Sequence, residues 1–202
     1  KLYNHSRKNP VPPLPTELAK LHKSGSGKRA DINRVEFVSA ILKSVPNRLR
    51  KKESDPPLPP TPEETLGNFF LSFDLDQVDR VSINQLMGGL TLLCGGKKSH
   101  KLSFAFSLFD MRKEEQKKSK KRKLDDVTSL SGKELFFFFQ SFLIVMFSCC
   151  KQSLDLTAET VSRYIADTAN MVTDDVMKFQ WATRKMDRIN FDEFGEWYNE
   201  GG

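Results

Sequence analysis

The chain has 202 residues, 38% of them hydrophobic, and a formal net charge of +6. This length allows one large domain or two small ones, and the positive charge favours acidic partners or anionic surfaces without indicating a fold. The three cysteines, Cys94, Cys149 and Cys150, show no CxxC spacing, so we expect buried free thiols rather than a disulfide framework. No secretory signal is visible, and the apolar run 135–150 is shorter than the roughly 20 residues of a membrane span. We therefore expect an intracellular, cytoplasmic protein, with membrane association or a nuclear location as alternatives.

Proline divides the first third of the chain. Residues 1–15 are polar and proline-rich and are interpreted as a tail. A helix is expected over 17–24, and a second one from Asn33 to about residue 43. The basic and proline-rich stretch 45–61 then predicts a stiff, extended linker.

A strong helix start follows the linker. Thr61-Pro62-Glu63-Glu64 combines an N-cap, a proline in the first turn and a glutamate at the third position. The apolar residues of this helix recur at spacings of three and four: Leu66, Phe69, Phe70 and Phe73. A loop is expected over 74–79, and a new helix from Ser82 to Cys94.

The second half is also predicted to be helical. The expected elements are a helix over about 100–109, a charged insertion over 111–128, a helix from Ser131, a long helix capped by Thr157 and a last helix over 191–198. For 170–186 the pattern leaves both loop and helix open. Because no segment shows a convincing strand period, the fold class is all-α.

A short phrase occurs four times along the chain. Each copy has an aliphatic residue, then Ser or Asn, then Glu or Gln three positions later, then Leu or Phe. The copies are 32–37, 81–86, 130–135 and 189–194. Each copy is a capping-box sequence, in which the short polar side chain caps a new helix and the residue three later reaches back to the cap. Four copies indicate a repeated supersecondary unit.

This repeat resembles the EF-hand, in which helix, loop and capped helix follow one another. Residues 74–85 can be placed on the twelve-residue calcium loop without a gap, and residues 99–110 look like the incoming helix of a third EF-hand in recoverin-like and calcineurin-B-like proteins. The resemblance implies two lobes of paired units with short β bridges between loops. The first pair would span 16–97, with units at 17–44 and 62–95, and the second 98–202, with units at 99–149 and 157–200.

The aliphatic residue of each phrase has a defined role in that resemblance. In EF-hand pairs this position joins the two loops through a short antiparallel bridge. We therefore expect Ile32 to pair with Val81, and Leu130 with Ile189. A simpler interpretation is a hydrophobic contact at a helix N-terminus, and both interpretations bury the four residues.

Most calcium-ligand positions carry the wrong residue types. Calcium prefers six to eight oxygen ligands, a glycine at loop position six and a bidentate glutamate at position twelve. The best candidate loop departs from this pattern at Val78, Asp79 and Gln85, and the third loop is too long between its end residues. The candidate ligands are Asp74, Asp76, Arg80, Ser82 and Gln85 in the second loop, and Asp110 and Glu134 in the third. We expect no metal or only weakly bound Ca²⁺.

Two further features suggest partners. The helix over 135–147 is apolar nearly all round, so either it lies centrally in the fold or one face is open to a partner helix. The residues proposed for such a groove are Phe137, Phe138, Phe142, Ile144 and Val145. The insertion carries a basic run that we expect to be solvated, with anionic membrane contact as an alternative and no support for nucleic-acid binding: Lys117, Lys118, Lys120, Lys121, Arg122 and Lys123.

No nucleophile, P-loop or zinc-protease motif is present, so we do not expect an enzyme. The sequence favours a regulatory, protein-interaction module with degenerate calcium loops, which belongs to a larger signalling protein and binds a protein partner or an adjacent domain. The alternative is a calcium sensor that binds the ion at the second loop or at the third.

Overall fold

The computed structural model describes residues 31–44, 60–112, 127–150 and 157–201. The expected tail, the expected helix 17–24, most of the linker and Lys117–Lys123 lie outside these residues. The described chain is mostly helical, so the all-α prediction is confirmed. Its longer helices are α2 (Arg34–Ser44), α3 (Pro62–Phe73), α4 (Ile83–Leu93), α5 (Lys98–Leu108), α7 (Gly132–Cys150), α8 (Ala158–Arg184) and α9 (Phe191–Asn199).

Local side-chain capping starts several of these helices. The Thr61 side chain accepts a hydrogen bond from the Glu64 N–H, and the Thr61 N–H donates to the Glu64 carboxylate in return. Asn190 and Glu193 form the same reciprocal pair. Asn33 and Glu36 do so at the start of α2, with distances of 2.9 and 3.1 Å. The predicted box at Ser82 is wrong, because the Ser82 side chain makes no capping bond. Such a cap satisfies N–H groups that have no partner within the helix.

Four short strands form two antiparallel pairs. In the first pair, β1 (Asp31–Ile32) lies beside β2 (Val81–Ser82), and Ile32 is opposite Val81. In the second, β3 (Ser129–Ser131) lies beside β4 (Arg188–Asn190), and Leu130 is opposite Ile189. These are the two pairings that the sequence predicts, and all four side chains are buried.

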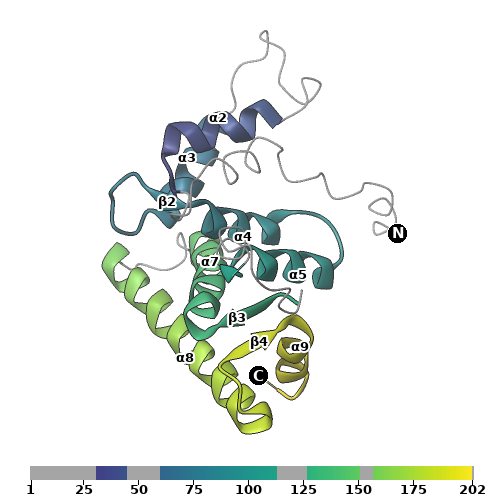
Figure 1. Ribbon diagram of the computed structural model, residues 1–202. Coiled ribbons are helices and arrows are strands. Elements are labelled where there is room, and N and C mark those ends of the chain that lie inside the picture. Colours follow the sequence, from purple (N-terminus) through teal and green to yellow (C-terminus); the bar gives the residue numbers. More distant parts are fainter. Residues whose placement is uncertain (1–30, 45–59, 113–126, 151–156, 202) are drawn as a thin grey trace, which may run out of the picture.

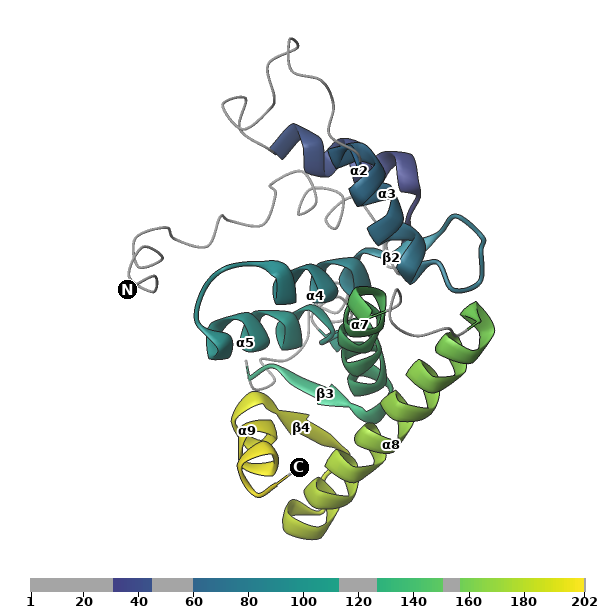
Figure 2. The same ribbon diagram turned by 180° about the vertical axis from the view of Figure 1, so that it is seen from behind.

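Helix α7 is shared by two hydrophobic clusters. Figures 1 and 2 show α2 and α3 at one end of the molecule, α9 and β4 at the other, and α7 between them. Ile144 and Val145 of α7 belong to the first cluster, whose other buried members include Phe37, Phe70, Leu86 and Ile165. Leu135 and Phe138 of α7 belong to the second, with Phe106, Leu130, Ile189 and Trp197.

The place of α7 corrects the prediction of a partner groove. Phe138, Ile144 and Val145 are buried, and Phe137 and Phe142 are half-buried against the second cluster. A helix that is apolar all round is typical of a buried position, because each of its faces meets another element. Of the two interpretations that the sequence leaves open, the central helix describes α7. The groove predicted on these residues is wrong for Phe138 and Val145, whereas Ile144, although buried, lines an open groove beside α8.

A close approach positions α4 against α3 and α7. A Cβ on Gly89 would clash with the Phe73 ring and lie 2.9 Å from Val145 Cγ2. Glycine is thus required by packing here, although it lowers helix propensity. Further along, the segment left open as loop or helix is helical, since α8 continues to Arg184. Within the described residues no helix combines the length and the apolar composition needed to cross a membrane.

Candidate functional site

The loop between α3 and β2, residues 74–80 and here named loop 2, closes around one carboxylate. Asp74 is 8% exposed, and its two oxygens accept hydrogen bonds from the Val78 and Asp79 N–H groups, each at 3.0 Å. Gln77 and Asp79 adopt left-handed backbone conformations with φ of 54°. Asp79 thus takes the conformation that glycine provides in a calcium loop. Its carboxylate also accepts the Arg34 N–H at 3.1 Å and caps α2.

The other predicted ligands of loop 2 do not converge on Asp74. Asp76 and Arg80 are exposed. The Gln85 amide donates to Gln140 Oε1 on α7 at 2.8 Å, so it is directed to a residue 55 positions away in the sequence. Since Ser82 makes no side-chain cap, the phrase at 81–86 is used for a contact between helices rather than for a capping box.

The described ends of the connection between α5 and β3, residues 109–112 and 127–128, are here named loop 3. Arginines bind the carboxylate of Asp110 in this loop and that of Glu134 in the first turn of α7. Asp110 accepts two bonds from the Arg112 guanidinium, at 3.1 and 3.0 Å, and one from the Ser129 N–H at 3.2 Å. Glu134 accepts Arg188 Nη2 at 2.8 Å, and the same nitrogen lies 3.6 Å from Asp110 Oδ1. The structure therefore brings together the two predicted end residues of this loop, with a guanidinium between them.

Burial is the largest single influence on the pKa of Asp110, but the hydrogen bonds and the charge of Arg112 together outweigh it. Burial alone would raise the pKa of this carboxyl group, but the bonds from Arg112 and from the Ser129 N–H lower it below its ordinary value. The pKa of Arg112 is raised, chiefly by its hydrogen bond to Asp110. The Asp110 carboxylate is consequently held in its charged form within a nearly closed site, where its side chain is 1% exposed.

The glutamates of the first and fourth phrases, Glu36 and Glu193, also have partners within the protein. In α9, after the loop 185–187 and β4, Glu193 lies 3.3 Å from Arg184 Nε and accepts a hydrogen bond from Gln180 Nε2 at 3.0 Å. At the first phrase Glu36 bonds back to the Asn33 N–H. In each of the four phrases, the Glu or Gln that corresponds to the last calcium ligand therefore already has a hydrogen bond within the protein.

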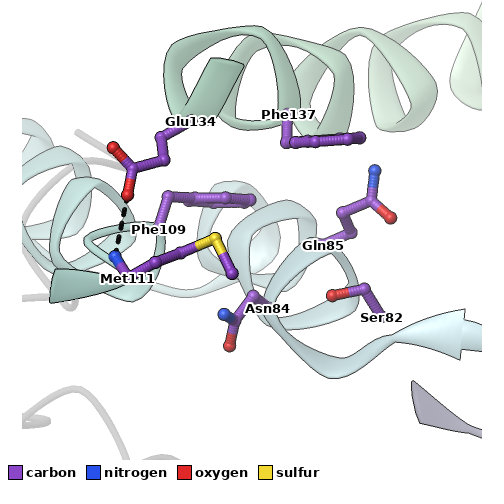
Figure 3. Close-up of a pocket in the computed structure, with 7 residues that line it drawn as sticks. All are labelled: Ser82, Asn84, Gln85, Phe109, Met111, Glu134 and Phe137. Atoms are coloured by element: carbon purple, nitrogen blue, oxygen red, sulfur yellow. Dashed lines mark hydrogen bonds between the residues drawn. The ribbon is translucent and has the colours of Figure 1, made fainter. Parts of the chain in front are cut away.

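Figure 3 shows a small cavity beside Glu134. A cavity of about 30 Å³ lies between the first turn of α4, the residues after α5 and the first turns of α7. Gln85 extends toward α7, whereas Glu134 turns to the Met111 N–H, which it accepts at 2.9 Å. This volume is about the share of one water molecule, so the cavity is too small for an organic ligand.

A larger, open groove separates the start of α2, the end of α3 and loop 2 from the end of α7 and the start of α8. Its volume is about 1040 Å³, and its wall is mainly apolar. The apolar lining residues are Val35, Leu71, Leu75, Ile144, Phe147, Val161 and Ile165. Val35 is 72% exposed and Leu71 is 48% exposed at its rim. We name it the α3–α8 groove; of the groove residues predicted from the sequence, it contains Ile144.

The donor arrangement does not fit a calcium ion. Calcium needs several free oxygens around one point. Asp74 directs both of its oxygens to N–H groups, and Asp110 and Glu134 face arginines. Among the residues that the structure describes, no three His, Cys, Asp or Glu side chains gather in a metal-binding arrangement. The set Asp74, Asp76, Arg80, Ser82 and Gln85 is thus not assembled as a ligand set.

Three residues of this region were not identified from the sequence: Arg112, Arg188 and Gln140. Arg112 lies two residues after Asp110, and this short spacing was an available signal. Arg188 and Gln140 come from distant segments. Only the predicted pairing of Leu130 with Ile189 could have placed Arg188 near loop 3, since Arg188 directly precedes Ile189.

Comparisons of this chain with protein-family models, with curated proteins and with solved structures give no match.

Proposed function

We propose that this chain is a regulatory, protein-binding module of the EF-hand type that keeps its shape without calcium. The support comes from the order of the elements: α3, α5 and α8 each lead through a loop to a short strand and then to another helix. The strands pair two by two at the positions that such loops use. An EF-hand module of this kind has no catalytic role.

The observation that carries the proposal is the internal pairing of the loop carboxylates. Arg188 meets Glu134, Arg184 meets Glu193 and backbone N–H groups meet Asp74. A loop whose negative charges are already compensated gains little from a cation, because binding would first have to break these bonds. The module would therefore act as a fixed shape rather than as a calcium switch.

Calorimetric titration of the full chain with calcium chloride tests this property. We expect no binding heat at millimolar calcium, and the same midpoint of thermal unfolding in calcium and in EDTA. Micromolar binding that disappears in Asp74→Ala and is weakened in Asp76→Ala would instead support the calcium sensor, with loop 2 as its site.

The α3–α8 groove is the surface on which the module would bind its partner. A groove with an apolar wall suits an amphipathic helix with anchors at i, i+3 or i+4, and i+7. The groove lies beside the first cluster, to which five of its apolar lining residues belong: Leu75, Ile144, Phe147, Val161 and Ile165.

A selection of displayed random peptides against the full chain tests this surface. We expect the selected peptides to have helical apolar spacing and to lose binding at least tenfold in Leu71→Asp. The matched control is Leu93→Asp, because Leu93 is 58% exposed but does not line the groove. Peptides that bind both variants equally well would show that the partner surface lies elsewhere.

A further inference from the structure

Loop 3 contains an oxygen-rich site that is filled by guanidinium groups. Arg188 Nη2 donates to Glu134 Oε2 and to the Ser129 carbonyl, and Arg188 Nε donates to Ser129 Oγ at 3.1 Å. Arg112 donates to Asp110 and to the Val127 carbonyl at 2.8 Å. Carboxylate, carbonyl and hydroxyl oxygens are the ligand types that a hard divalent cation prefers.

The two carboxylates need positive charge close by. The side chains of Asp110 and Glu134 are only 1% and 8% exposed, so water cannot compensate their charge. An uncompensated buried carboxylate costs several kcal/mol. The arginines supply the compensation at hydrogen-bonding distance.

Arg112 and Arg188 do not contribute equally. Arg112 reaches one carboxylate, that of Asp110, from two residues away in the sequence. Arg188 comes from β4 and approaches both carboxylates, Glu134 at 2.8 Å and Asp110 at 3.6 Å. It is also the residue opposite Ser131 in the β3–β4 pair, so its position is fixed by the strand register.

We propose that Arg188 is a built-in cation that takes the place of a divalent ion in loop 3, so that removing its charge makes the fold responsive to calcium. This inference rests on the proposed calcium-independent module and names the residue responsible for that independence. Without Arg188, Asp110 and Glu134 carry two negative charges against the single positive charge of Arg112. The Ser129 carbonyl and hydroxyl oxygens are then free to join them around an ion. Arg188 acts here as a positioning residue, since it links β4 to Ser129 of β3 and to Glu134 of α7.

The test compares thermal unfolding of the full-length wild-type chain with that of Arg188→Met, in EDTA and in millimolar calcium chloride. We expect the unfolding midpoint of Arg188→Met to fall by roughly 6–12 °C in EDTA, because one partner of a buried pair is lost. We expect calcium to restore much of this loss, and the restored part to grow with calcium concentration as linked binding requires. The wild-type midpoint should be the same in both buffers.

Three further variants separate a cation site from a general stability effect. Arg188→Lys keeps the charge and should show no calcium response. Arg184→Met removes the arginine beside Glu193 and should show no calcium response either. Asp110→Asn combined with Arg188→Met should lose the response that Arg188→Met alone shows.

Each outcome decides one of the two proposals. A calcium response in the wild-type chain contradicts the proposed function whatever the variants do. An unresponsive wild type together with an unresponsive Arg188→Met overturns the inference alone. If Arg188→Met does not fold in EDTA, Arg188→Gln replaces it in the same comparison, because a glutamine amide retains a donor for the Ser129 carbonyl. If calcium does not promote refolding of the variant, the inference is contradicted.

Discussion

Loops 2 and 3 each connect a helix to a short strand, yet their carboxylates are bound by different chemistry. Loop 2 closes around Asp74, whose oxygens accept two backbone N–H groups of the same loop. At loop 3, Asp110 and Glu134 are bound by arginines, Arg112 from the same chain segment and Arg188 from β4. The first arrangement is local and needs no basic side chain. The second is long-range and depends on buried charge.

This difference has energetic consequences. A charge-assisted bond to a backbone N–H contributes about 1.5–3 kcal/mol, and the loss of its acceptor leaves neutral donors. The loss of one partner from a buried ion pair leaves an uncompensated charge and costs more. Substitutions in loop 3 should therefore be more destabilising than matched substitutions in loop 2.

The largest effect is expected for Glu134→Ala. This change removes the acceptor of the Met111 N–H, the Ser131 N–H and hydroxyl, and the Arg188 guanidinium. The free energy of unfolding should fall by about 3–5 kcal/mol, because Arg188 is left without its closest carboxylate partner. Urea unfolding followed by circular dichroism measures it. The exposed neighbour Lys133→Ala should stay within about 0.5 kcal/mol of the wild type, and an equal loss in both variants would contradict the role of the ion pair.

Asp110→Asn should cost about 3 kcal/mol at neutral pH, near the lower limit for a broken buried pair. The folded-state pKa of Asp110 lies below its ordinary value of 3.8, so its ionised form stabilises the fold above that value. This stabilisation is lost as the pH falls through the folded-state pKa. The difference in unfolding free energy between wild type and Asp110→Asn should therefore shrink as the pH falls from neutral to below 3.8. A difference that stays constant over this range would show that the charge of Asp110 is not what stabilises loop 3.

The sequence predicted the local part of this architecture well. Caps at Asn33, Thr61, Thr157 and Asn190 follow from bonds that span two or three residues, and the structure contains them. The pairings of Ile32 with Val81 and of Leu130 with Ile189 followed from the repeat and the EF-hand resemblance together. The caps could be predicted because the residues of each one lie within a few positions of one another in the sequence, and the pairings because the phrase recurs.

The long-range part could not be predicted in the same way. Gln85 fits a capping box in sequence, but Gln140 on α7 offers it a partner that only the folded chain brings near. The burial of Phe138, Ile144 and Val145 required knowing that α7 lies between two clusters. Arg188 was overlooked for the same reason, because its carboxylate partners are 54 and 78 positions earlier, at Glu134 and Asp110.

Asp74→Ala tests the closure of loop 2 and should have a smaller effect than the two loop 3 variants. Two N–H groups lose their acceptor, but both belong to exposed residues and can bind water when the loop opens. The loss in unfolding free energy should be about 2 kcal/mol. Amide hydrogen exchange of Val78 and Asp79 should accelerate in the variant, whereas Asp76→Ala should leave both rates unchanged. A loss as large as that of Glu134→Ala would remove the distinction between the two loops.

The smallest expected effect is a gain in stability within loop 2. Gln77 and Asp79 both have φ of 54°, a conformation that costs a side-chain-bearing residue about 1–2 kcal/mol, and part of this cost is returned as unfolded-state entropy when glycine replaces it. Gln77→Gly should therefore raise the free energy of unfolding by about 0.5–1 kcal/mol. Asp79→Gly relieves the same backbone conformation but also removes the acceptor of the Arg34 N–H, so its net effect should be close to zero. Equal gains in the two variants would mean that Asp79 does not cap α2, whereas a gain confined to Gln77→Gly would explain why an aspartate, rather than a glycine, occupies the sixth position of this loop.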